Sequence, residues 1–135
     1  MEKTNFENLQ IYQLSERLAD KVWRVVIGWE NIGRDTLGKQ LVRAVDSVGA
    51  NIAEGSGRGT DAELRRFLRI SRGSLYETKH WLRCAYKRRL LSEKQVAELL
   101  PILEELTPKL NAYLRSVGGL KRDRTVRAKE KLAKT

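Results

Sequence analysis

The sequence predicts an all-α fold, an antiparallel up-down-up-down four-helix bundle with a basic C-terminal tail. Three observations lead to this prediction. Apolar residues recur at spacings of three and four in four successive segments, which is the periodicity of amphipathic helices. Short stretches with glycine or capping residues separate these segments. The alternating pattern that is typical of strands does not occur in the 135 residues.

The first predicted helix covers about residues 8–30. Its main apolar stripe consists of Ile11, Leu14, Leu18, Val22, Val25 and Trp29. A second apolar strip lies about 100° around the same helix. Its members are Tyr12, Ala19, Trp23, Val26 and Ile27. A lone helix hairpin would leave this strip in water, so we predict that it forms an oligomer interface.

The second and third helices follow a break at "NIGRDT". The apolar pattern restarts at Leu37 and continues to Ile52. We expect Gly55 to follow the second helix as a residue in the left-handed conformation. Thr60 and Glu63 have the spacing of a capping box, which predicts the start of a third helix that continues to about residue 89.

The fourth predicted helix begins at a second capping box, Ser92 with Gln95, and continues to Val117. Pro101 and Pro108 each remove a backbone hydrogen bond, so we expect a kink, or a break before Pro101. Residues 1–117 form the predicted bundle domain. Residues 118–135 are predicted to be a solvated tail, or a helix that orders only against an acidic partner.

Composition excludes several classes of function. Cys84 is the only cysteine and His80 the only histidine, so we expect neither a disulfide framework nor a zinc site. The chain has no signal-peptide core and no run of roughly 18 apolar residues, which predicts a soluble cytoplasmic protein without membrane contact. We expect no cofactor, no metal and no small-molecule substrate.

The net charge of +10 is concentrated in two segments. Residues 58–91 contain ten Lys and Arg against three Asp and Glu, and residues 118–135 contain seven against two. The rest of the chain is close to neutral. Acidic polymers are therefore candidate partners.

The cations of the third helix fall close to one line. Arg65, Arg69, Arg72, Lys79 and Arg83 lie within about 40° of it, and Tyr76 lies in its middle. Such a line can neutralise successive phosphates while the tyrosine stacks on a base. The alternative is a charged face that only increases solubility. Like charges at this spacing repel one another, which favours use over solubilisation.

We therefore predict a set of nucleic-acid-binding residues in the third helix, the loop before it and the tail. The set is Arg58, Arg65, Arg69, Arg72, Tyr76, Lys79, Arg83, Lys87, Lys121, Arg122, Arg124 and Arg127. Arg58 lies in the loop "GSGRG", which is free to present it outward. Neither a preceding strand nor a following GK[ST] accompanies this loop, so a nucleotide-binding loop is not predicted.

The stretch "SVGANIAEGSGRG" also places polar residues on a face that should meet the third helix. We interpret five of them as a structural polar cluster: Ser47, Asn51, Glu54, Ser71 and Ser74. Serines of the third helix can hydrogen-bond across to the second helix and fix its register. Catalysis by Glu54 would need a matched second group, and none is present at useful spacing, so we predict no enzyme.

The order of these features resembles a known family. The segments "NFENLQIYQLSERLADKVW", "LVRAVDSVGANIAEGSGRG" and "RRFLRISRGSLYETKHWL" are similar to the bacterial four-helix bundle family. That family includes the 23S rRNA intervening-sequence proteins and, as relatives, the accessory variability determinants of diversity-generating retroelements. The resemblance covers roughly residues 5–117. Gly49, where the family usually has proline, and the basic stretch "ETKHWLRCAYKRR" depart from it.

The resemblance implies an antiparallel bundle that assembles into a homopentameric ring. In the retroelement relatives, the ring is a partner of a reverse transcriptase and its template RNA during mutagenic cDNA synthesis. We therefore expect a non-enzymatic accessory protein whose partners are RNA or an RNA/DNA hybrid, a reverse transcriptase and further copies of itself. The alternative is a protein-interaction scaffold of the 23S rRNA intervening-sequence type that does not touch nucleic acid.

Overall fold

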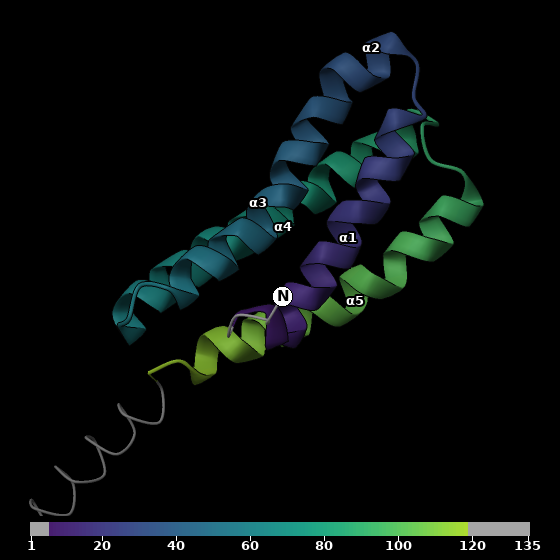
Figure 1. Cartoon of the computed structure of the whole chain (residues 1–135). Coiled ribbons are helices and arrows are strands. Elements are labelled where there is room, and N and C mark those ends of the chain that lie inside the picture. Colours follow the sequence, from purple (N-terminus) through teal and green to yellow (C-terminus); the bar gives the residue numbers. More distant parts are fainter. Residues whose placement is uncertain (1–5, 119–135) are drawn as a thin grey trace, which may run out of the picture.

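The computed structural model describes residues 6–118, which form four long α-helices with no strand among them (Figure 1). The prediction of an all-α chain is confirmed for these residues. The long helices are α1 (Gln10–Ile27), α3 (Lys39–Ser56), α4 (Asp61–Lys87) and α5 (Glu93–Ser116). A 3₁₀ turn, η1 (Phe6–Asn8), precedes α1.

The segment predicted as a break between the first two helices is itself helical. α2 (Asn31–Gly33) and the π-helical turn η2 (Arg34–Gly38) lead directly into α3. A Cβ atom on Gly38 would lie 2.7 Å from Val26 Cγ1. The backbone of η2 therefore packs directly on α1, and glycine is needed here for close approach.

Capping fixes the starts of α4 and α5 where the sequence predicts them. Thr60 Oγ1 accepts a hydrogen bond from the Glu63 backbone N–H at 3.2 Å. Ser92 and Gln95 form a complete reciprocal capping box at α5.

The end of α3 differs from the prediction. Gly55 is buried inside the last turn of α3, and the left-handed glycine of the following loop is Gly59, with φ +87°. The assignment of Gly55 as the residue after the helix was therefore wrong.

α5 continues through both of its prolines. Pro101 and Pro108 are exposed, and so are Ala97 and Glu104, the residues four positions before them. Water can therefore satisfy the carbonyl groups that lose an N–H partner. The predicted break before Pro101 was wrong, and the α5 ribbon bends along its length without interruption (Figure 1).

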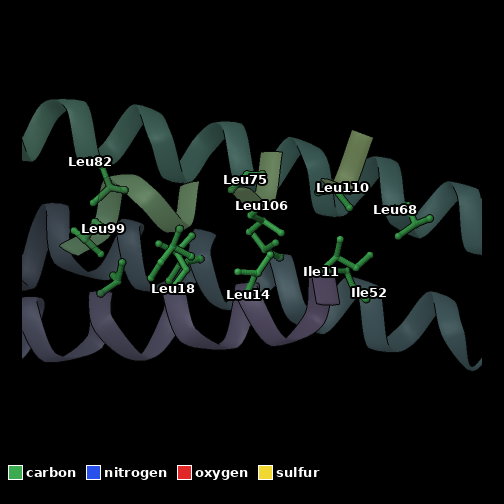
Figure 2. Packing of buried hydrophobic residues seen from close by; sticks show 14 of the residues in the cluster. Ile11, Leu14, Leu18, Ile52, Leu68, Leu75, Leu82, Leu99, Leu106 and Leu110 are labelled. Carbon is green, nitrogen blue, oxygen red and sulfur yellow. The ribbon is translucent and has the colours of Figure 1, made fainter. Parts of the chain in front are cut away.

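The core lies between the four long helices and consists of aliphatic side chains (Figure 2). Each helix contributes completely buried members, such as Leu18 of α1, Leu41 of α3, Leu75 of α4 and Leu106 of α5. Full burial of one such side chain stabilises the fold by roughly 1.5–3 kcal/mol. The periodic residues identified in the sequence therefore supply the core.

Two long-range hydrogen bonds mark the ends of the bundle. The Trp29 side chain donates from Nε1 to the Leu90 carbonyl at 2.9 Å, which joins the loop after α1 to the loop after α4. Arg65 Nη1 donates to the Val117 carbonyl at 2.7 Å, which joins the start of α4 to the end of α5. α3 packs against α4 far more extensively than α5 does. No helix within residues 6–118 is long and apolar enough to cross a bilayer.

Candidate nucleic-acid interface

α4 carries the line of cations that the sequence predicts, which we call the cationic rail. Its members are Arg65, Arg69, Arg72, Lys79 and Arg83. Arg69 and Arg83 are exposed, whereas Arg65, Arg72 and Lys79 are partly buried. Arg65, Arg69 and Arg72 are neighbours on the helix surface, and so are Lys79 and Arg83, because residues three and four positions apart lie about 5–6 Å apart at Cβ. Tyr76 lies between the two groups, so the rail follows one side of α4.

Two guanidinium groups of the rail are held by neutral groups of the α5 segment. Arg65 donates to the backbone carbonyl of Val117 at 2.7 Å, and Arg72 donates from Nη1 to Asn111 Oδ1 at 3.4 Å. These acceptors fix the direction of the two side chains but do not neutralise their charge. The rail therefore follows the side of α4 that faces α5.

No carboxylate within residues 6–118 forms an ion pair with a cation of the rail. The ion pairs of that part of the chain involve Arg34, Arg58, Arg66 and Lys109 instead. The positive charge of the rail is therefore available to a polyanion.

Aromatic side chains accompany the rail. Tyr76 is 50% exposed, and Lys79 Nζ lies 5.4 Å from the centre of its ring. Tyr86 is 54% exposed and is not in the predicted set. Its position three residues after Arg83 was the signal that would have included it. Lys87, the last residue of α4, is also exposed.

Arg58 is exposed, as the sequence predicts, but it is paired with a carboxylate. Its guanidinium forms an ion pair with Glu54 at 2.7 Å and lies 5.0 Å from the centre of the Phe67 ring. Both charged side chains are about half exposed, so the pair adds at most about 1 kcal/mol. A phosphate would have to compete with Glu54 for this arginine.

The predicted polar cluster is assembled with one exception. Asn51 Nδ2 donates to Ser47 Oγ at 2.9 Å, and Ser74 Oγ of α4 donates to the same Ser47 oxygen at 2.9 Å. The buried Ser71 hydroxyl donates to the Val48 carbonyl at 2.8 Å. The exception is Glu54, which pairs with Arg58 at the surface. The cluster therefore links α3 to α4 without a carboxylate.

The fold leaves some residues of the predicted interface strip of α1 exposed and buries others. Trp23 and Ile27 are 55% and 52% exposed, whereas Tyr12 and Ala19 are partly buried and pack against the core. Val26 is buried in the core itself, where it meets the backbone of η2. The assignment of Val26 to a surface between subunits was therefore wrong.

Carboxylates gather near Tyr12 and on the adjoining part of α3. Burial raises the pKa of the Tyr12 hydroxyl, and the nearby Glu16 raises it further. Partial desolvation raises the pKa of the Asp46 carboxyl, and repulsion from Asp20 adds to this shift. These shifts mark a locally negative surface on α1 and α3, on different helices from the rail.

Other predicted groups give no site or lie outside the described residues. Lys121, Arg122, Arg124 and Arg127 of the tail lie outside them. Cys84 Sγ lies 3.8 Å from His80 Nε2. Between Phe6 and Gly118, no group of three His, Cys, Asp or Glu residues is placed to hold a metal ion.

One family model matches most of this chain. The family described as 23S rRNA-intervening sequence protein matches residues 7–112. A similar solved structure is that of a protein with unknown function from the S23 ribosomal protein family of Bacteroides thetaiotaomicron VPI-5482. It has a TM-score of 0.69 and 20% identity, and the match covers 78% of this chain and 99% of that chain. A search of curated proteins gave no match. At this identity, the structural likeness shows the fold alone.

Proposed function

Because this chain belongs to the 23S rRNA-intervening sequence protein family, and because its rail has no carboxylate partner within residues 6–118, we propose that it is a non-enzymatic RNA-binding accessory protein. The absence of a carboxylate partner for the rail within residues 6–118 is the observation that carries this proposal. A one-signed line of cations repels itself, and phosphates relieve that repulsion.

The dimensions of the rail suit a nucleic-acid strand. Arg65 and Arg83 are 18 residues apart, or roughly 27 Å along the helix. At 3.4 Å per phosphate along one strand of a duplex, this length covers roughly eight phosphates. Arg65 and Arg72 are already oriented by Val117 and Asn111, so less side-chain freedom is lost on binding. Tyr76 supplies a face for base stacking.

The finer proposal follows the family resemblance. The protein acts as the accessory variability determinant of a diversity-generating retroelement, and its partners are a reverse transcriptase and RNA or an RNA/DNA hybrid. It does so as a homopentamer. The exposure of Trp23 and Ile27 supports a further subunit contact on α1.

We also infer the up-down-up-down order of the helices. The contact of Trp29 with Leu90 brings the end of α1 next to the end of α4. The contact of Arg65 with Val117 brings the start of α4 next to the end of α5. Both contacts support this order.

Charge reversal tests the proposal for RNA binding. The double variant Arg69→Glu/Arg72→Glu should bind a fluorescein-labelled single-stranded RNA of 20 nucleotides at least about 100-fold more weakly at 50 mM salt, because two phosphate contacts become repulsive. Binding is measured by fluorescence anisotropy. The loss should be similar for RNAs of different sequence, because phosphate contacts carry little sequence information.

A matched control separates the effect of the rail on RNA affinity from the effect of net charge. Arg24 of α1 and Arg43 of α3 are exposed and without a partner among the described residues. Arg24→Glu/Arg43→Glu changes the net charge by the same amount and should retain most of the affinity. Equal losses in the two double variants would show that total charge, and not the rail, attracts RNA.

A further inference from the structure

A groove of about 430 Å³ lies between α4 and α5. Most of its lining is apolar, and the main contributors are Leu82, Tyr86, Val96, Leu99, Leu100 and Leu103. Leu100 is 47% exposed and Tyr86 is 54% exposed. Large apolar residues that are exposed together mark interaction sites more often than ordinary surface.

The walls of the groove have helical periodicity. On α5, Val96, Leu99, Leu100 and Leu103 follow one another at spacings of three, one and three residues. Grooves between two helices accept a third helix whose apolar residues recur at three- and four-residue intervals. The groove therefore has the form of a helix-binding site.

The charges at the two rims differ. The α4 rim carries Lys79 and Arg83, neither of which has a carboxylate partner within residues 6–118. The α5 rim carries Glu104 and Thr107. A helix in this groove would gain from carboxylates along its edge toward α4.

We propose that the groove binds an amphipathic helix of a partner protein, with apolar residues on the leucines and carboxylates facing Lys79 and Arg83. The inference rests on the proposed function only in requiring a protein partner, because it assigns that partner a surface beside the RNA-binding rail. RNA and the partner helix would both contact Lys79 and Arg83. Arg69 would contact only the RNA, and Leu100 would contact only the partner helix.

Other occupants fit the groove less well. A nucleobase would place the polar atoms of its edges against leucine side chains, and unpaired polar groups in such surroundings are costly. The basic tail of this chain, with seven Lys and Arg against two Asp and Glu, would be repelled by Lys79 and Arg83.

The test uses two designed peptides of 18 residues with identical leucines on one helical face. One peptide has glutamates along one edge of that face, and the other has lysines in their place. Both carry fluorescein, and binding to the full chain is followed by anisotropy. The glutamate peptide should bind the wild-type protein at least about tenfold more tightly than the lysine peptide.

Four variants locate the site. Leu100→Asp should weaken binding of the glutamate peptide at least about tenfold. Ile70→Asp should not, since Ile70 is 42% exposed on α4 but does not line the groove. Lys79→Glu/Arg83→Glu should reverse the preference between the two peptides. Arg69→Glu/Arg72→Glu should lower RNA affinity without changing peptide affinity, which separates this inference from the proposed function.

Several results would overturn the inference. They are no peptide binding at 100 µM peptide, equal losses for Leu100→Asp and Ile70→Asp, and equal affinity for the two peptides. If Leu100→Asp lost binding of the labelled single-stranded RNA, the groove would be assigned to RNA. Dissociation of an oligomer by Leu100→Asp would assign it to a second copy of this chain.

Discussion

Gly55 and Gly73 show that neighbouring helices use the same residue type for different reasons. Gly55 lies where α3 and α4 approach closely, and a Cβ atom there would be 2.8 Å from Phe67 Cβ and 3.2 Å from Leu64 Cδ1. Gly73 lies in the middle of α4 with no atom within 4 Å of its added Cβ. Steric need therefore explains Gly55, but nothing in the structure explains Gly73.

Alanine substitutions test the different roles of these two glycines. Gly55→Ala should destabilise the fold by about 1–3 kcal/mol, because α3 and α4 must move apart. Gly73→Ala should stabilise it by about 0.5–1 kcal/mol, because alanine has the higher helix propensity. Urea unfolding measures both changes. A neutral Gly55→Ala variant would contradict the close packing of the two helices.

At the residue scale, the sequence predicted which polar side chains share a helix face better than it predicted which residues pack against a neighbouring helix. The i, i+4 spacing of Ser47 and Asn51 correctly placed both side chains on one face of α3, because this geometry does not depend on the rest of the fold. The predicted link from that face to Ser74 of α4 is present in the structure. The environments of Gly55 and Val26 depend on a partner helix or turn that periodicity does not locate. The ion pair of Glu54 with Arg58 depends on how the chain leaves α3, which the glycines of the loop leave open.

At the element scale, α5 tolerates proline because its outer face is exposed. Pro101 and Pro108 are seven residues apart and both exposed. An interior proline costs a helix about 3 kcal/mol relative to alanine. Periodicity and capping predicted α4 and α5 well, because both signals are local. The turn at η2 escaped prediction, since its backbone geometry depends on contact with Val26.

Replacement of proline tests this view of α5. Pro101→Ala should raise the free energy of unfolding by up to about 3 kcal/mol, because the N–H restored at position 101 can bond to the Ala97 carbonyl. Pro108→Ala should act in the same direction. Thermal unfolding followed by circular dichroism measures the effect. If either variant were less stable than wild type, the bend in α5 would be required for packing of the core.

At the scale of the whole molecule, cationic and apolar surfaces are divided among the helices. The rail is on α4, the helix-binding groove lies between α4 and α5, and the exposed apolar residues Trp23 and Ile27 are on α1. A homopentamer as proposed would repeat the rail five times around a ring. Charge predicted the rail and periodicity predicted the apolar strip of α1 from the sequence, but neither predicted the groove or which of the apolar residues remain exposed.

The proposed subunit contact on α1 has a direct test. Trp23→Glu/Ile27→Glu should convert the proposed homopentamer to monomers, since two carboxylates cannot be buried unpaired between subunits. Sedimentation velocity measures the mass, and circular dichroism shows that the fold is kept. Ile32→Glu is the control, because Ile32 is 81% exposed on α2. Pentamers that persist in the double variant would place the interface elsewhere.

The most direct test of the central claim is the salt dependence of RNA affinity, measured by anisotropy between 50 and 200 mM salt. If the rail and the basic tail together neutralise six to ten phosphates, affinity should fall by roughly 10³ to 10⁵ over this range. In a plot of the logarithm of affinity against the logarithm of salt concentration, Arg69→Glu/Arg72→Glu should reduce the slope by the amount expected for about two phosphate contacts. An affinity that stays constant over the same range would contradict the claim that this protein holds RNA through its phosphates.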